Sequence, residues 1–193
     1  MTGPAATANW YRRPGVRGSA SAAAFAAAAV AVVALAAGGA PSVATAASAK
    51  AKALKGSGTD PKGDAPTGSV DIVGASAKYA ATGSLSFTVT MAGALDFTKA
   101  NGLVVLLSAG GCGRNLIGAG VDLTDPTVPW AYRFTKKPRE IDGQGKAKGS
   151  KYSASFRSSE LGKQKPAYLQ VAIYPPGDNS PDPLDETDCI TLR

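Results

Sequence analysis

The stretch LSFTVTM, residues 85–91, decides the fold class. Its four apolar side chains occupy every second position, and Ser or Thr occupies each position between them. Successive side chains of a β-strand point to opposite faces of the sheet, so this alternation predicts a strand with one buried and one wet face. We therefore expect a fold built of half-buried strands.

The same alternation recurs at residues 152–157 and 169–174. The apolar run 103–107 predicts a central strand buried on both faces, and residues 70–80 and 190–192 predict an opening and a closing strand. Gly and Pro turn signals separate these segments, and one of these signals predicts a hairpin turn at 142–145. No sustained helical period is present. The sequence thus predicts an all-β domain: an immunoglobulin-like or jelly-roll-type antiparallel β-sandwich of about seven to nine strands. Residues 158–161 predict one helical turn.

The N-terminal segment 1–46 has the order of a secretory signal peptide. Three arginines and no acid lie in its first 17 residues, a run of Ala, Val, Leu and Phe fills 22–37, and small-x-small triplets follow at 44–46 and 47–49. This order predicts cleavage and secretion. Two alternatives stay open: an uncleaved membrane anchor, since about 20 apolar residues span a bilayer, and a twin-arginine signal at Arg12-Arg13.

Residues 47–68 read as a flexible linker, because lysines are scattered there among Ala, Gly, Ser and Pro with little apolar area to bury. The globular domain is expected at 69–193. The leader holds three of the 21 basic residues and none of the 14 acids, so without it 18 basic and 14 acidic side chains remain and the net charge falls from +7 to +4. A nucleic-acid surface needs a denser basic stripe, so no nucleic-acid partner is predicted.

The chain has two cysteines, Cys112 and Cys189, and no histidine. An even cysteine count in an exported protein predicts a disulfide. The lack of histidine excludes Ser-His-Asp and Cys-His catalysis and histidine metal sites. The Gly-rich turn 110–114 is interpreted as a turn around the disulfide rather than a phosphate loop, because no helix follows it.

An acidic segment precedes the second cysteine. It holds five carboxylates within residues 178–188, and calcium takes such oxygen ligands. The candidate calcium ligands are Asp178, Asp182, Asp185 and Asp188. The alternative is a solvated loop with no metal, so no cofactor is required.

Aromatic residues supply the second candidate site. Trp130, Tyr132 and Phe134 alternate, so their rings point the same way on a strand. Aromatic rings stack on sugars. The candidate ligand face therefore consists of Trp130, Tyr132 and Tyr174. The alternative is that the aromatic residues, Tyr152 and Tyr168 included, form the core.

A basic group is the third candidate, and it consists of Lys136, Lys137, Arg139, Lys146, Lys148 and Lys151. Such residues either protect a sheet edge from aggregation or bind an anionic wall polymer.

Several short segments resemble secreted bacterial β-sandwich modules of the DOMON and family-9 carbohydrate-binding type. The matching segments are Asp71-Ile72-Val73, residues 83–89, 103–107 and 118–123, and the late strand that follows Leu161-Gly162. Members of that group bind sugars, haem or calcium, or have no known ligand. Where such modules often carry an acidic turn, residues 108–115 hold no carboxylate, so the resemblance implies no calcium there, and haem ligation by histidine is impossible.

The sequence therefore predicts a secreted, non-catalytic binding or structural module, associated with the cell envelope or a glycan and contacting a membrane only through an uncleaved leader. Two other classes stay open. One is a glycan hydrolase using a carboxylate pair from Glu140, Asp142 and Glu160. The other is a small secreted inhibitor or protein-binding domain.

Overall fold

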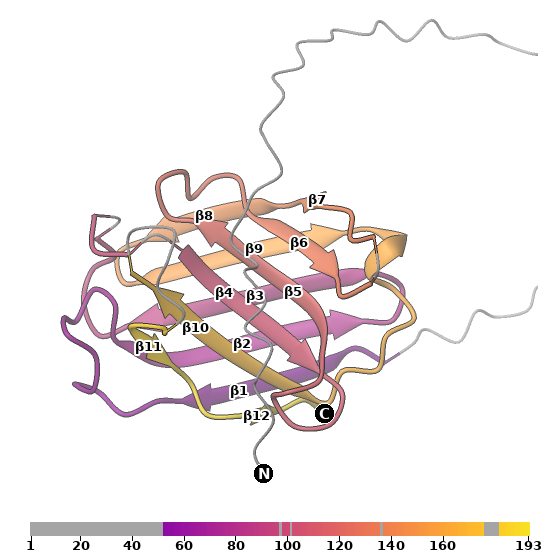
Figure 1. Cartoon of the computed structure of the whole chain (residues 1–193), viewed down its shortest axis with the longest axis horizontal. Helices are drawn as coiled ribbons and strands as arrows, with labels where there is room; N and C mark the ends of the chain where they lie inside the picture. The colour runs from indigo at the N-terminus through magenta and orange to yellow at the C-terminus, as the bar shows by residue number, and fades with distance from the viewer. Residues whose placement is uncertain (1–51, 97, 101, 136, 176–181) are drawn as a thin grey trace, which may run out of the picture. The chain divides into compact units, whose positions relative to one another are not determined.

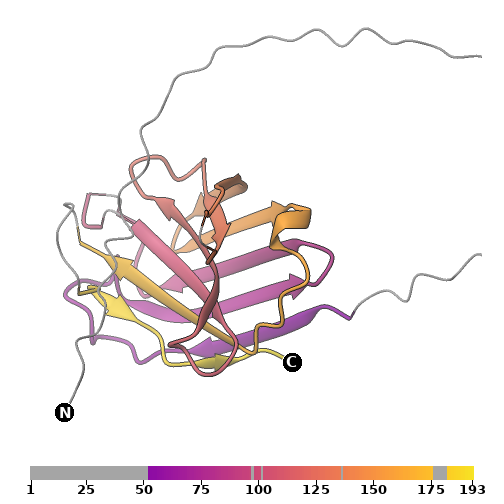
Figure 2. The same cartoon turned by 45° about the vertical axis from the view of Figure 1, so that its right-hand side comes forward.

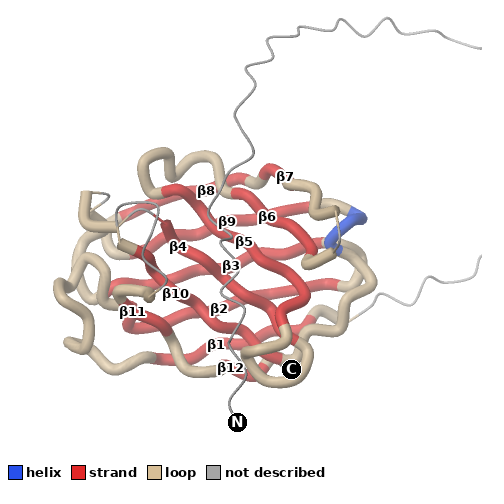
Figure 3. The backbone as a smooth tube through the Cα atoms, viewed as in Figure 1, coloured by secondary structure: helices blue, strands red, loops and turns tan. Residues whose placement is uncertain are grey.

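The computed structural model describes residues 52–96, 98–100, 102–135, 137–175 and 182–193. Within these ranges the chain forms twelve strands and one short 3₁₀ helix, η1 (Ser159–Leu161), and all strand pairs are antiparallel (Figures 1 and 3). The predicted all-β sandwich is confirmed, and three strands of only two residues raise the count above the expected seven to nine.

Residues 1–46, the predicted signal peptide, lie outside the described residues. In the described ranges, no helix combines the length and apolar character that a membrane span requires.

The strands form two sheets that face one another, with sheet B crossing in front of sheet A in Figure 1 and the two layers seen obliquely in Figure 2. Sheet A has the order β1-β2-β3-β9-β8, with bounds β1 (Leu54–Thr59), β2 (Ile72–Ala80), β3 (Ser84–Met91), β9 (Lys151–Arg157) and β8 (Gln144–Lys148). Sheet B has the order β11-β10-β4-β5-β6-β7, and β12 also pairs with β10. Its bounds are β11 (Asp185–Glu186), β10 (Tyr168–Tyr174), β4 (Gly102–Ser108), β5 (Asn115–Asp122), β6 (Trp130–Arg133), β7 (Ile141–Asp142) and β12 (Ile190–Thr191).

The core lies between the inner faces of the two sheets. The alternation predicted for residues 85–91 is confirmed, because all four apolar side chains of that stretch are buried and the Ser and Thr side chains between them are half-buried on the outer face. The two large tyrosines of the core satisfy their hydroxyl groups: Tyr79 donates to the carbonyl of Leu161 at 2.9 Å, and Tyr152 donates to that of Pro126 at 3.0 Å. Burial therefore leaves neither hydroxyl without a partner.

The N-terminal edge of sheet A meets the C-terminus of the chain, which lies beside β1 and β12 in Figures 1 and 2. Lys55 and Arg193 exchange two backbone hydrogen bonds, of 2.7 and 2.8 Å. Glycines allow this approach, because a Cβ at Gly56 would lie 2.6 Å from the carbonyl oxygen of Thr191, and one at Gly58 would lie 2.7 Å from Cγ1 of Ile190. The two sheets are thereby joined along this edge.

The prediction that residues 47–68 form a flexible linker is wrong for residues 54–59. These residues form β1, which pairs with β2 along its whole length. The small residues that indicated flexibility instead permit close packing, and the apolar cover comes from the C-terminal strand at the other end of the chain.

The predicted hairpin turn at 142–145 is also wrong. β7 pairs with β6 in sheet B and β8 pairs with β9 in sheet A, so the chain crosses from one sheet to the other at Gly143. The ring of Phe156 lies where a Cβ of Gly143 would be, which explains the glycine at the crossing. The hairpin between β8 and β9 turns at Gly149 instead, with a φ of 60°.

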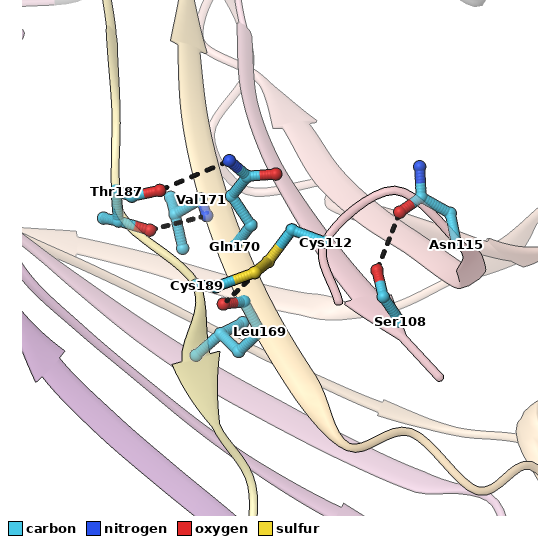
Figure 4. Close-up of a disulfide and its surroundings, with 8 residues drawn as sticks. All are labelled: Ser108, Cys112, Asn115, Leu169, Gln170, Val171, Thr187 and Cys189. Atoms are coloured by element: carbon cyan, nitrogen blue, oxygen red, sulfur yellow. Dashed lines mark hydrogen bonds between the residues drawn. A yellow bond between two sulfur atoms is a disulfide. The ribbon is translucent and has the colours of Figure 1, made fainter. Parts of the chain in front are cut away.

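The disulfide joins Cys112, in the turn after β4, to Cys189, between β11 and β12, and confirms the predicted pairing (Figure 4). The two Cα atoms are 5.8 Å apart, and the bridge lies beside the carbonyl of Leu169 in β10. The Gly-rich segment is a turn, as interpreted, closed by a hydrogen bond of 3.1 Å from the N–H of Ala109 to the carbonyl of Arg114. Thr187 also attaches the segment after β11 to β10, because its backbone N–H and its hydroxyl both form hydrogen bonds with the backbone of Val171.

We expect Gly56→Ala to lower the free energy of unfolding by about 1–3 kcal/mol, because the new methyl group must displace the backbone of Thr191. Urea denaturation of the two proteins measures the loss. Ser57→Ala is the matched control, since that side chain is exposed on the outer face, and its effect should stay within about 0.5 kcal/mol. Equal stabilities for the Gly56 variant and the parent would contradict the close contact between β1 and the C-terminal strand.

Replacing both cysteines, as Cys112→Ala and Cys189→Ala together, should lower the free energy of unfolding by about 4–5 kcal/mol. The bridge closes a loop with a sequence separation of 77, and loop-closure entropy of the unfolded chain sets this size. Denaturation of the parent with and without reductant gives the same comparison without mutation. A parent protein that reacts with two equivalents of alkylating agent before reduction would show that the bridge is not formed.

Candidate ligand-binding face and acidic cluster

The outer face of sheet B carries the predicted aromatic site. In β6, Ala131 is fully buried in the core, whereas Trp130 and Tyr132 on either side of it are half-buried on the opposite face. The alternative that the aromatic residues form the core is therefore wrong for this strand, although it holds for Tyr152, which is fully buried.

Three rings form a row along this face. The rings of Trp130 and Tyr132 are near-parallel, with centroids 5.5 Å apart, and Phe134 meets Tyr132 edge-on at 5.2 Å. Two glycines of β5 lie directly across from the row, Gly118 opposite Tyr132 and Gly120 opposite Trp130. A Cβ at Gly118 would be 3.0 Å from Cζ of Tyr132, and one at Gly120 would be 2.8 Å from Cζ2 of Trp130. The rings thus lean over β5 into space that glycine leaves open.

Tyr174 of β10 belongs to the same face. Burial raises the pKa of Tyr132, and the negative charge that Tyr174 carries when ionised raises it further. The pKa of Tyr174 is also raised, first by burial and then by the charge of Glu186. The structure therefore brings the three predicted ligand residues, Trp130, Tyr132 and Tyr174, to one surface.

The strand between these aromatic residues is β4. Its Leu103, Val105 and Leu107 are fully buried, as predicted for a central strand, but Val104 and Leu106 are only half-buried. Their side chains share the outer face with the aromatic row, because Val104 pairs with Gly120 and Leu106 pairs with Gly118. The outer face of sheet B therefore has an apolar area with phenol hydroxyls on it, bordered by Gln170, Glu186 and Asp142.

The outer face of sheet A has the opposite character. An open groove of about 1230 Å³ crosses it, lined mainly by hydroxyl side chains and by Lys55, Lys78 and Lys146. One row across the strands reads Ser57, Ser76, Thr88, Ser153 and Lys146. Of the predicted basic group, the structure places Lys146, Lys148 and Lys151 together beside this groove, while Lys136 lies outside the described residues.

The predicted calcium ligands are only partly brought together. Asp178 lies outside the described residues, and Asp182 and Asp188 are exposed. Asp185 instead joins two acids from the other end of the chain, because one carboxylate oxygen each of Asp60, Asp64 and Asp185 lies within 4.8 Å of the others. Sequence reasoning missed Asp60 and Asp64, which stood in the supposed linker more than 120 positions from Asp185.

No family model, no curated protein and no solved structure matches the chain. The resemblance to carbohydrate-binding and DOMON-type modules stays a prediction.

We expect Trp130→Ala to lower the free energy of unfolding by about 1–2 kcal/mol, because the ring is half-buried outside the core. Phe87→Ala is the comparison, since that ring is 3% exposed in the core, and it should cost about 3–5 kcal/mol. Chemical denaturation of both variants tests the difference. Losses of equal size would place Trp130 in the core and remove the candidate face.

Proposed function

We propose that the chain is an exported, non-catalytic module that binds a glycan on the outer face of sheet B. The observation that carries this proposal is the aromatic row of Trp130, Tyr132 and Phe134, which lies half-buried on the outer face of sheet B, away from the core. Outward positions of a sheet are ordinarily polar, so large rings there need a reason beyond the core.

The chemistry of the face suits a sugar. A sugar ring presents an apolar C–H face and hydroxyl groups at its edge, and an aromatic ring with a phenol group nearby complements both. Trp130 supplies apolar area, and the hydroxyls of Tyr132 and Tyr174 supply donors and acceptors on the same surface. Val104 and Leu106 extend the apolar area across β4.

Two observations support a binding role over glycan hydrolysis. Hydrolysis requires two carboxyl groups that face one another across the substrate. The three candidate acids, Glu140, Asp142 and Glu160, are all exposed side chains. Glu160, one of the candidate acids, forms an exposed ion pair with Arg139, with 3.5 Å between Oε1 and Nη1.

Export is supported by the order of residues 1–46 and by the disulfide. Disulfides persist in oxidising compartments and are rare in a reducing cytosol. The formed pair of Cys112 and Cys189 therefore agrees with a secreted or cell-envelope location.

The proposal predicts that the full chain is retained by at least one insoluble neutral polysaccharide, such as cellulose or chitin. Trp130→Ala should weaken binding at least about tenfold, or roughly 1.4 kcal/mol, in a depletion isotherm. Lys78→Ala, on the opposite sheet, is the control and should bind like the parent. No retention on any of these polymers, or equal binding by the Trp130 variant, would refute the proposal.

The groove of sheet A favours a second candidate function, the binding of an anionic wall polymer. Lysines and hydroxyl groups line it, and a polymer with phosphate or carboxylate groups complements both. The same assay separates the two candidates. Binding at this groove would fall with added salt and with Lys78→Ala, and Trp130→Ala would not change it.

A further inference from the structure

Four carboxylates converge where the two ends of the domain meet. Asp60 follows β1, Asp64 lies in the connection to β2, Asp71 immediately precedes β2, and Asp185 begins β11. The three acids Asp60, Asp64 and Asp185 each offer an oxygen within 4.8 Å of the other two. Calcium binds oxygen at about 2.3–2.6 Å, so oxygens at this spacing can all contact one ion.

The backbone holds these carboxylates in place. The N–H of Ile72 donates to Oδ2 of Asp185, which ties β11 to the start of β2. The N–H of Gly63 donates to Oδ2 of Asp71 at 2.8 Å, and the N–H of Asp60 donates to the carbonyl of Val73. The acids are thus oriented by main-chain bonds rather than by pairing with basic side chains.

Asp71 is an independent indication of a cation site. Its side chain is only 2% exposed, and its Oδ1 has no hydrogen-bond partner. It faces the cluster, because its other oxygen accepts from the turn between Asp60 and Asp64 and its charge acts on Asp185. Oδ2 of Asp60 is also buried without a partner. Burying carboxylate oxygens unpaired is costly, and a cation is the group that compensates them best.

Electrostatics agree with this geometry. Burial, together with the charges of Asp185 and Asp64, raises the pKa of Asp60 to about 6. Burial likewise raises the pKa of Asp185, although the N–H of Ile72 opposes this and the charges of Asp64 and Asp71 add to it. Among the described residues, no Lys or Arg side chain forms an ion pair with Asp60, Asp64, Asp71 or Asp185.

We propose that Asp60, Asp64 and Asp185 bind one Ca²⁺ ion, with Asp71 as the buried fourth charge behind them. A set of several carboxylates without histidine or cysteine suits a hard cation. Calcium accepts such an irregular set, whereas Mg²⁺ demands near-ideal octahedral geometry at 2.0–2.1 Å and keeps most of its waters. The ion would join the end of β1 to β11 and so fasten the C-terminal segment that the disulfide also holds.

Calorimetric titration of the full chain with CaCl₂ and thermal unfolding in EDTA or 10 mM CaCl₂ test this site. We expect one ion per chain and a rise in Tm of roughly 5–10 °C with calcium, and a clearly smaller rise with MgCl₂. Asp64→Asn and Asp60→Asn should abolish the calcium-dependent rise. In EDTA the Tm of each should equal or exceed that of the parent, because one like charge is removed from the cluster.

Glu186→Gln is the matched control. It lies next to Asp185 in β11 but is exposed, and it should retain the full calcium response. A parent Tm that does not change with calcium would overturn the proposal. So would an equal calcium response in the Asp60 and Asp64 variants, which would indicate adventitious surface binding, or an equal response to Mg²⁺. The low stability of a misfolded variant would be recognised by its Tm in EDTA.

Discussion

The backbone hydrogen bonds between Lys55 and Arg193 connect the two sheets at their open edge, and much of the domain depends on this contact. An unpaired edge strand exposes hydrogen-bonding groups that invite association with other chains. Here the C-terminal strand covers the edge of sheet A, and the missing side chains of Gly56 and Gly58 make room for it. At the opposite edge the chain crosses from β7 to β8 at Gly143, so the two sheets are linked there by continuous backbone.

The same C-terminal segment is held in three further ways. β11 and β12 both pair with β10, the disulfide fixes Cys189 to the turn after β4, and the N–H of Ile72 binds the carboxylate of Asp185. These attachments share one consequence: they set the position of Asp185 against Asp60. An ion at the acidic cluster would bind carboxylates whose backbone is already fixed by the disulfide and by main-chain hydrogen bonds. Binding would therefore cost little ordering entropy.

The alternating strands could be predicted from sequence because their pattern is local. Residues 85–91, 152–157 and 169–174 each show which side chains face the core, and the structure confirms these, although Ala172 at an outward position is also buried. β1 could not be predicted, because its apolar cover comes from residues 190–193 and its own sequence resembles a linker. The acidic cluster was hidden for the same reason: Asp60 and Asp185 are adjacent only in the folded chain. The aromatic row was found, since its alternation is local, but which face it occupied depended on the pairing of β6 with β5.

The two outer faces differ although both sheets fold by the same rule. Outward positions of sheet A carry Ser, Thr and Lys, as solvation requires, whereas those of sheet B include Trp130, Tyr132, Val104 and Leu106. Part of this is local stabilisation, because an aromatic side chain covers a glycine directly across from it in a neighbouring strand. Stability alone does not explain why β5 has glycine at these positions, because glycine within a strand is itself destabilising by roughly 0.5–1 kcal/mol. β-branched residues would stabilise β5 better. Glycine at two successive outward positions has one effect that those residues would not reproduce: it leaves room for the rings to lie across β5, toward Val104 and Leu106 of the next strand. A surface of that form is what a ligand with an apolar face would meet.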